Sequence, residues 1–359
     1  MDVISQVLNH VPLGFSQENR EVALCLLEGE VLVEIDLATI CGSDLHSVHG
    51  KRETPLPGVL GHEAVGRIVQ LEKKERNLKI GDRVTWTLVD NCGNCQPCLD
   101  WNHPEKCENL FKYGHAVFTS TNGLNGCFAS HIHLRRGTHL VKIPDTLNDF
   151  LAAPVNCSLA TMVNVVETMP QDCKRVLILG AGILGIYGCA LLHQKGIKEI
   201  YCLDISSRRL SMVPSFGGIP LQEGLGAYRD FSSFQNEMKG KLDMVIEVAG
   251  VKQLVAPSLP LIRPGGLLTL AGLVHPDSEL GIKGEDIIRK CLTIRGVHNY
   301  QPKHLDIAVD FLNKTRLEYP YEKLVSKPYP LDQIKSAFSA AEQGEWHRVS
   351  LKPNLIPEK

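Results

Sequence analysis

Four cysteines stand close together in the segment NCGNCQPCLDWNHPEKC, as a C-x2-C-x2-C-x8-C run of Cys92, Cys95, Cys98 and Cys107. Thiols this dense in one loop are typical of structural zinc, because four thiolates fill the tetrahedral shell of the ion and leave no open position for chemistry. The loop 92–107 therefore predicts a closed metal site, and any catalysis must lie elsewhere in the chain. Disulfides or a chance cluster are the alternatives.

The composition is that of an ordinary globular protein, with 359 residues of which 43% are hydrophobic and 22% charged. Such a length allows roughly two domains. The 38 basic and 40 acidic residues leave a formal charge of -2, which offers no electrostatic footprint for nucleic acid or an anionic membrane and favours a small-molecule substrate. No charged stretch followed by an apolar core opens the chain, so we expect a cytoplasmic protein with reduced thiols.

The uncharged stretch Val176–Leu192 comes near the length of a membrane span, but it contains four glycines in a strand-turn-helix pattern. We interpret it as buried core.

The first part of the chain, up to about Pro154, is made of short β segments separated by Gly, Pro and Asn. Dense turn residues without long helical periodicity favour a twisted antiparallel or barrel-like domain. The expected strand segments are 31–40, 58–71, 82–89 and 127–134.

Beyond Pro154 strands alternate with helices, which predicts βαβ units and a doubly wound parallel sheet, an α/β fold. The expected strands are 175–180, 199–204, 243–250, 267–273 and 292–297, and the expected helices are 183–195, 206–213 and 252–262. Pro214 predicts a short or kinked helix after residue 206. We expect the tail to rejoin the first domain, so that residues 1–155 and 297–359 form one domain and residues 156–296 the other.

A dinucleotide-binding fingerprint, G-x-G-x-x-G, lies between the strand at 175–180 and the helix that follows. It consists of Gly180, Gly182, Ile183, Leu184 and Gly185. Its first glycine permits the tight turn, the second lets the backbone approach a pyrophosphate, and the third lets the helix pack on the strand. This pattern predicts a Rossmann domain, although a flavin or mononucleotide fold without nicotinamide is the alternative.

Asp204 ends the next strand, nineteen positions past Gly185. Its carboxylate can accept hydrogen bonds from the adenine ribose and would repel a 2′-phosphate, so NAD is the expected cofactor. Arg208 and Arg209 follow closely and can neutralise a phosphate, which keeps NADP open.

Two further motifs carry metal-ligand residue types: Cys41-Gly42-Ser43-Asp44-Leu45-His46 and Gly61-His62-Glu63. With these motifs, the four-cysteine loop and the glycine-rich turn in this order, the chain resembles the zinc-dependent medium-chain alcohol and polyol dehydrogenases over nearly its whole length. The resemblance implies a GroES-like β-barrel catalytic domain together with the Rossmann domain. It also implies two zinc ions per chain, one catalytic and one structural.

By that resemblance Cys41 and His62 are the first two ligands of the catalytic zinc. Cys157 in LAAPVNCSLAT is the third, as in the alcohol-dehydrogenase branch, whereas polyol-type relatives carry Glu there. A core cysteine is the alternative for Cys157. Glu63 is a reserve ligand that approaches the zinc when water and substrate exchange. Three protein ligands leave one position open, at which zinc acts as a Lewis acid toward an alcohol.

Three residues of the CGSDLH motif have expected roles beside the metal. We interpret Asp44 as the acceptor of the spare imidazole N–H of His62, which fixes the tautomer of that ligand. Ser43 is expected to pass the alcohol proton toward the nicotinamide ribose and His46, because a hydroxyl donates and accepts while an imidazole titrates near neutral pH. The simpler interpretations are a turn serine, an exposed loop histidine and an exposed turn aspartate.

The substrate is the least constrained feature, because loops build such pockets. The runs KCENLFKYGHAVF and APVNCSLATMVN resemble the phosphonate-catabolism-associated alcohol dehydrogenases, which implies a small alcohol with an anionic group held by Lys112 or His115. The other candidate contacts are Lys51, Arg52, Trp86, Tyr113, His298, Asn299 and Tyr300. A polyol or threonine 3-dehydrogenase activity and a nonenzymatic nucleotide-binding protein are the alternatives. The resemblance also implies a homodimer or homotetramer.

Overall fold

The computed structural model describes residues 1–72, 78–119, 123–224 and 228–353. The chain forms two compact units. The first unit contains Met1–Cys157, Gln301–Arg316 and Tyr321–Lys359, and the second contains Ser158–Tyr300 and Leu317–Pro320. The short segment Leu317–Pro320 thus returns to the second unit after the chain has entered the first.

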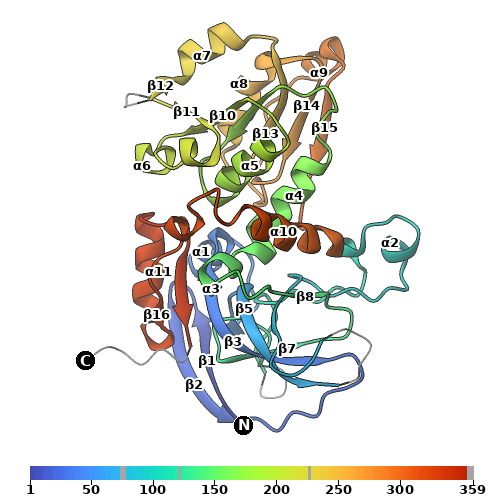
Figure 1. The fold of residues 1–359 in the computed structure, drawn as a ribbon, viewed down its shortest axis with the longest axis vertical. Helices are drawn as coiled ribbons and strands as arrows, with labels where there is room; N and C mark the ends of the chain where they lie inside the picture. Colours follow the sequence, from blue (N-terminus) through green and yellow to red (C-terminus); the bar gives the residue numbers. More distant parts are fainter. Residues whose placement is uncertain (73–77, 120–122, 225–227, 354–359) are drawn as a thin grey trace. The chain divides into compact units, whose positions relative to one another are not determined.

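The first unit is built on β-strands that form two sheets (Figure 1). A small antiparallel sheet has the order β2-β1-β4, and a seven-stranded sheet has the order β16-β17-β3-β5-β6-β8, with β7 paired to β3. The strands are β1 (Asp2–His10), β2 (Gly14–Glu21), β3 (Val31–Ile40), β4 (Gly58–Val59), β5 (Glu63–Leu71), β6 (Arg83–Trp86), β7 (His131–Leu134), β8 (Leu140–Lys142), β16 (Tyr329–Pro330) and β17 (Val349–Lys352). The helices are α1 (Gly42–Val48), α2 (Gln96–Leu99), α3 (Asp149–Ala152), α10 (Pro302–Thr315) and α11 (Ile334–Gln343).

Strand β3 is the centre of this unit, and it covers the predicted segment 31–40 from its first residue to its last. Most of its side chains are buried, because β5 and β7 pair with it and α11 packs over the neighbouring β17. The core includes Trp86, Phe128 and Phe338, each fully buried. Burial of this apolar surface is the main stabilising force on the sheet.

The C-terminal strand β17 adds to β3 in antiparallel register, with Val349 opposite Ile40 and Leu351 opposite Ala38. Since β3 ends one residue before Cys41, this register brings the residue just before β17, Arg348, alongside the end of β3. Pairing between strands more than 300 positions apart therefore decides what surrounds Cys41.

The second unit is a parallel sheet of order β12-β11-β10-β9-β13-β14-β15. The strands are β9 (Arg175–Leu179), β10 (Glu199–Asp204), β11 (Ile219–Gln222), β12 (Arg229–Asp230), β13 (Leu242–Glu247), β14 (Ile262–Leu270) and β15 (Thr293–Gly296). The helices are α4 (Ala160–Glu167), α5 (Ile183–Gln194), α6 (Ser207–Leu210), α7 (Phe231–Met238), α8 (Val255–Ser258) and α9 (Gly284–Lys290). Helix α5 packs on β9 and β10, as in the predicted βαβ arrangement.

Proline and glycine residues shape two places in this unit. The helix after Asp204 is a single turn, α6, followed by a 3-10 turn that starts at Val213 with Pro214 at its beginning, so the predicted interruption is present. The Pro-Gly-Gly segment at 264–266 lies inside β14 as an irregularity in its pairing with β13. Gly265, at φ 71°, supplies the backbone conformation that this irregularity needs.

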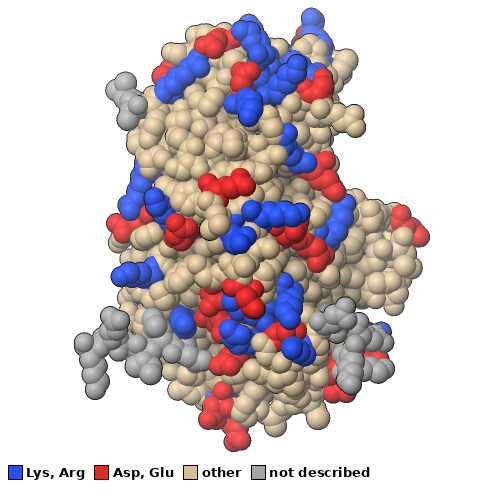
Figure 2. All heavy atoms as spheres, in the orientation of Figure 1, with Lys and Arg blue, Asp and Glu red and all other residues tan. Residues whose placement is uncertain are grey.

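A helical run from Asp149 to Glu167 joins α3 and α4 through a π-helical turn, Val155–Leu159. It is the one helix among the described residues that is long and apolar enough to cross a membrane, and 78% of the apolar window is buried inside the protein. We therefore interpret it as a core helix. On the face drawn in Figure 2, basic and acidic side chains are interspersed over both units, in keeping with the formal charge of -2.

Phe338→Ala is expected to lower the free energy of unfolding by about 3–5 kcal/mol, because it leaves a cavity in the core. The ring is fully buried and lies 5.3 Å from the ring of Phe15 and 5.9 Å from that of Phe128. Urea unfolding measures the change. Leu27→Ala is the control, since that side chain is 70% exposed and its loss should shift stability by less than about 0.5 kcal/mol. Equal effects of the two substitutions would contradict this account of the core.

Candidate active site

The four cysteines of the loop 92–107 converge, with all four sulfur atoms within 4.8 Å of one another. The Sγ of Cys95 lies 3.3 Å from that of Cys98 and 3.8 Å from that of Cys107. Sulfurs bound to one tetrahedral zinc lie about 3.7 Å apart, whereas bonded sulfurs lie about 2 Å apart. All twelve cysteines are free thiols, so the geometry of the loop fits a metal and not a pair of disulfides.

Backbone groups of this loop already point at sulfur. The N–H groups of Cys92 and Asn109 donate to the Sγ of Cys107 over 3.2 and 3.4 Å. Such N–H···S contacts stabilise thiolates, which is the form that binds metal. The left-handed Gly93, at φ 68°, makes the turn between the first two cysteines.

A second group of candidate ligands lies in the first unit and is made of Cys41, His62, Glu63 and Cys157, again with one ligand atom of each within 4.8 Å of the others. Cys41 follows β3 and is the N-cap residue of α1, His62 comes just before β5, Glu63 begins β5, and Cys157 lies in the π-helical turn. Cys157 thus reaches residues about 95 and more positions away, as the sequence interpretation requires. Turns of the π type occur often at functional sites.

Asp44 contacts the backbone and the imidazole next to this group of candidate ligands. Its carboxylate is 1% exposed and accepts from the backbone N–H of Cys41 at 2.9 Å and of Gly61 at 3.3 Å. One of its oxygens lies 3.5 Å from Nδ1 of His62, and that nitrogen has no hydrogen-bond partner within the described residues. The imidazole thus has Nδ1 toward the carboxylate of Asp44.

The other imidazole nitrogen, Nε2 of His62, lies 3.4 Å from the Oγ of Ser43. Burial by itself lowers the pKa of His62, but the Asp44 carboxylate and the Cys41 thiol raise it to about 10. The Cys41 thiol and the Asp44 carboxylate therefore favour positive charge at this place. A divalent cation satisfies the same demand with a neutral imidazole as ligand, so these residues fit a zinc ion.

Glu63 is held by a buried ion pair that the sequence interpretation missed. Its carboxylate accepts from Nε of Arg348 at 2.7 Å, from Nη2 of Arg348 at 2.8 Å and from the hydroxyl of Thr39 at 2.6 Å. Burial opposes the charge of Arg348, but Glu63 and the Cys41 thiol raise its pKa further above the ordinary value. The guanidinium also approaches the Sγ of Cys41 to 3.5 Å.

Asn156 is a second missed residue. Its side-chain amide is fully buried and donates to the backbone carbonyls of His62 at 3.0 Å and Trp86 at 2.9 Å. It thereby ties the π-helical turn to His62, the residue just before β5. The only sequence signal was its place beside Cys157.

Residues expected around the substrate lie in different settings. Trp86 and Tyr113 are fully buried, so their side chains belong to the core and present no surface to a ligand. Lys51 and His46 are exposed, while Arg52, Lys112 and His115 are partly buried. His298, Asn299 and Tyr300 belong to the second unit.

The glycine-rich turn has the geometry expected of a phosphate-binding loop. A Cβ atom at Gly185 would lie 1.9 Å from the carbonyl oxygen of Gly180, so the helix can pack this closely on the strand only because residue 185 is a glycine. A Cβ atom at Gly182 would meet open space. Gly182 is the N-cap of α5, where Ile183 begins the helix and Leu184 follows. The free side of Gly182 at a helix N-terminus therefore leaves room for an anionic group.

Asp204, at the end of β10, faces this turn. Its carboxylate accepts from the backbone N–H of Ala181 at 2.8 Å and of Ser206 at 2.9 Å. The guanidinium of Arg209 lies 3.9 Å away. The pair places one negative and one positive group beside the turn.

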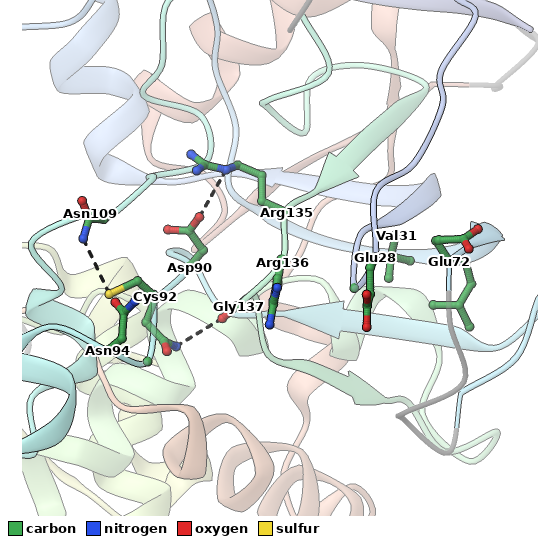
Figure 3. A pocket seen from close by; sticks show the side chains of 14 residues that line it. Glu28, Val31, Glu72, Asp90, Cys92, Asn94, Asn109, Arg135, Arg136 and Gly137 are labelled. Carbon is green, nitrogen blue, oxygen red and sulfur yellow. Dashed lines mark hydrogen bonds and ion pairs between the residues drawn. The ribbon is translucent and has the colours of Figure 1, made fainter.

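A cavity of about 590 Å³ lies elsewhere in the first unit, against the four-cysteine loop (Figure 3). Its lining includes Glu28, Asp90, Cys92, Arg135 and Arg136, and Figure 3 shows Asp90 paired with Arg135. None of the residues of the Cys41 group lines it. We therefore assign the candidate chemistry to the converging ligand atoms and not to this cavity.

Comparisons with known proteins identify the family of the chain. The alcohol dehydrogenase GroES-like domain family matches residues 27–145, and the glucose dehydrogenase C-terminus family matches residues 154–345. The chain is 28% identical over 335 residues to a D-arabitol-phosphate dehydrogenase of Enterococcus avium, covering 91% of each chain. It is 26% identical over 340 residues to an L-threonine 3-dehydrogenase of Shewanella sp. strain ANA-3, covering 90% of this chain and 92% of that one.

A crystal structure of an alcohol dehydrogenase from Thermotoga maritima superimposes with a TM-score of 0.90 at 26% identity, covering 99% of this chain and 100% of that one. A GroES-like unit followed by a Rossmann sheet defines a nicotinamide-dependent oxidoreductase acting on alcohols. The chain belongs to the zinc-dependent medium-chain alcohol and polyol dehydrogenases. The predicted family, fold class and enzyme class are confirmed, and the nonenzymatic alternative is set aside.

Arg348→Met is expected to lower the free energy of unfolding by about 3–5 kcal/mol, because it leaves the Glu63 carboxylate buried without its partner. Adding Glu63→Gln should recover part of that loss, and urea unfolding of the two single variants and the double variant gives the coupling free energy.

The control for this cycle is Arg67→Met on the same strand as Glu63. The side chain of Arg67 is 52% exposed and lies 3.4 Å from Asp36, so its loss should cost less than about 1 kcal/mol. If Arg348→Met is no more damaging than Arg67→Met, the buried pair does not hold this site.

Proposed function

We propose that Cys41, His62 and Cys157 bind a catalytic zinc and that the four-cysteine loop binds a second, structural zinc. In this proposal the enzyme oxidises a small alcohol that carries an anionic group, with NAD as the hydride acceptor. The observation that carries it is the convergence of two thiols and one imidazole, from three separate elements, at a buried place. Zinc bound in this way supplies a Lewis acid with one open position, which lowers the pKa of an alcohol toward neutrality.

The residues around the ligands keep them ready for this role. Asp44 orients His62 through Nδ1, which leaves Nε2 for the metal side. Arg348 occupies both oxygens of Glu63, so the carboxylate becomes a reserve ligand only when that ion pair loosens. The residues that hold the ligands in place are thus different from those proposed to carry the proton of the alcohol.

Ser43 is the first proton acceptor in the proposed relay. Its hydroxyl lies 3.4 Å from Nε2 of His62, so it stands beside the proposed metal position. His46 lies one turn further along α1 and is exposed, which suits the end of a relay that delivers a proton to solvent.

Asp204 supports NAD as the preferred cofactor, because its carboxylate would repel a 2′-phosphate. Gly180, Gly182 and Gly185 form the proposed pyrophosphate turn. The partial burial of Asp204 strengthens the repulsion, whereas the 3.9 Å approach of Arg209 weakens it.

A polyol or threonine 3-dehydrogenase activity is the second candidate, and the two relatives reported above favour it by their names. One of these relatives, by its name, acts on a polyol phosphate, which is an alcohol with an anionic group. The second candidate function therefore overlaps with the first. We also expect a homodimer or homotetramer through edge strands of the second unit, and a cytoplasmic location.

Zinc content and activity test the metal proposal together. Purified protein should contain about two zinc ions per chain. Cys41→Ser and Cys157→Ser should each retain about one, with kcat reduced by roughly 1,000-fold or more because the Lewis acid is lost. Atomic emission and NAD reduction are the measurements.

Cys25→Ser serves as the control because it removes an exposed thiol that lies outside both groups. It should keep both metal ions and full activity. Full activity in metal-depleted protein, or two zinc ions in Cys41→Ser, would contradict the proposal.

Asp204→Asn should raise kcat/KM for NADP relative to NAD by about tenfold or more, because the amide keeps the acceptor oxygen and removes the negative charge. Glu199→Gln, at the opposite end of the same strand, should leave the ratio unchanged. A wild-type preference for NADP would overturn the assigned role of Asp204.

A further inference from the structure

Asn156 has a polar side chain that is fully buried, and it directly precedes the candidate ligand Cys157 in the chain. It lies in the π-helical turn Val155–Leu159. Its amide donates to the backbone carbonyl of His62 at 3.0 Å and to that of Trp86 at 2.9 Å. A buried amide that makes two such bonds restrains the groups around it.

The chemistry of the two partners determines which end of the amide faces them. Both are carbonyl oxygens, which only accept hydrogen bonds, so the nitrogen of the Asn156 side chain must point at them. This NH2 group has two protons, one for each carbonyl. A leucine of similar size has no donor, and the single hydroxyl of a serine can donate to only one acceptor. The two bonds therefore depend on the amide.

The two carbonyls belong to segments that have stopped pairing with each other. In the direction of His62, the ladder between β5 and β6 ends with Gly66 opposite Val84. His62 comes just before β5 and Trp86 is the last residue of β6, so both lie beyond this pair. The amide of Asn156 thus bridges the two segments at the place where the ladder no longer holds them.

The sequence before Cys157 does not favour a regular α-helix. Pro154 has no N–H group to donate, and Val155 and Asn156 are poorer helix formers than alanine or leucine. The helical run has its π turn here, at Val155–Leu159. Bonds to residues distant in sequence are therefore needed to hold this turn in place, and the amide of Asn156 makes two of them.

One side chain thereby restrains the backbone at two of the three proposed ligands. One of these ligands is the next residue in the chain, and the other, His62, is bound through its carbonyl. Asp44 has the same role on the other side of the site, since its carboxylate accepts from the N–H groups of Cys41 and Gly61. Asp44 and Asn156 together connect the segments of all three ligands through bonds to main-chain groups.

We propose that Asn156 is a positioning residue for the catalytic zinc. Its amide holds the thiol of Cys157 and the imidazole of His62 at the separation that one zinc ion requires. This inference rests on the proposed function, which places zinc at these residues. The amide contacts main-chain carbonyls of the segments that carry the ligands, so it acts through the ligands and not on the substrate.

Asn164 offers a matched comparison in the same helical run. It is 7% exposed, and its amide donates to the backbone carbonyl of Asn299 at 3.0 Å and accepts from Nη2 of Arg295 at 3.3 Å. Asn164 belongs to neither group of candidate ligands. Asn164→Leu therefore also removes two hydrogen bonds of a buried amide, but neither of them involves a segment that carries a proposed ligand.

The test measures zinc in the full-length protein after dialysis against a chelator, at a concentration at which wild type keeps about two zinc ions per chain. Asn156→Leu should keep about one, because loss of a group that orients metal ligands weakens metal binding by about 10- to 100-fold. X-ray absorption of the remaining zinc should show four sulfur ligands and no imidazole, as expected of the four-cysteine loop. Asn164→Leu should keep about two zinc ions.

Thermal unfolding of the metal-depleted proteins separates positioning from a general loss of stability. Asn156→Leu and Asn164→Leu should lower the unfolding temperature to a similar extent, since each removes the hydrogen bonds of one buried amide. A difference in zinc retention between them then cannot come from stability. Asn156→Ser covers a leucine variant that does not fold, and it should weaken zinc binding at the same site by less, because its hydroxyl can still donate to one carbonyl.

The possible failures can be told apart. If wild type keeps two zinc ions and Asn156→Leu keeps both equally well, the inference is overturned and the proposed function stands. If Asn164→Leu loses the imidazole-bound zinc as readily, or Asn156→Leu loses both ions, the amide stabilises the fold without positioning the ligands. If wild type itself keeps a single zinc bound by four sulfurs, the proposed function is wrong and the inference falls with it.

Discussion

The proposed active site depends on the concentration of ionisable groups at one buried place. Two thiols, an imidazole and a carboxylate bring one ligand atom each within 4.8 Å of the others. Removing such groups from water is costly unless positive charge compensates them. Arg348 compensates Glu63 directly, and a divalent cation is the group that compensates the thiols while leaving the imidazole neutral. The fold around the site can be understood as the means of keeping these groups together.

Strand β3 is the element on which that arrangement is built. Cys41 follows the last residue of β3. On one side β3 pairs with β5, which begins with Glu63, and on the other side it pairs with β17, which follows Arg348. Asp44 on α1 returns to bind the backbone of Cys41 and Gly61. Asn156 then ties the π-helical turn of Cys157 to the backbone of His62. Four segments distant in sequence are thus fixed by hydrogen bonds to main-chain groups.

Local patterns in the sequence predict much of this. The four-cysteine spacing, the glycine-rich turn and the strands β3, β9 and β10 follow from short-range rules that act within about ten residues. The small N-terminal sheet of β1 and β2 was not predicted, because those strands carry many polar side chains and lack a clear alternation.

The contacts that complete the site could not be predicted, because they depend on tertiary pairing. Arg348 has no motif of its own, and only the register of β17 on β3 brings it to Glu63. Burial and the neighbouring Lys112 and His62 lower the pKa of His115 well below its ordinary value, and a single sequence does not reveal these contacts. Trp86 and Tyr113 illustrate the reverse case, since aromatic residues near a site were expected at the substrate and belong to the core.

Zinc X-ray absorption of the protein with both sites loaded tests the central claim most directly. The account predicts about three sulfur ligands per zinc at about 2.3 Å, averaged over a two-thiolate and a four-thiolate site, together with imidazole scattering. That imidazole signal should vanish in His62→Ala. A spectrum with four sulfurs per zinc, or an imidazole signal that survives His62→Ala, would contradict the account.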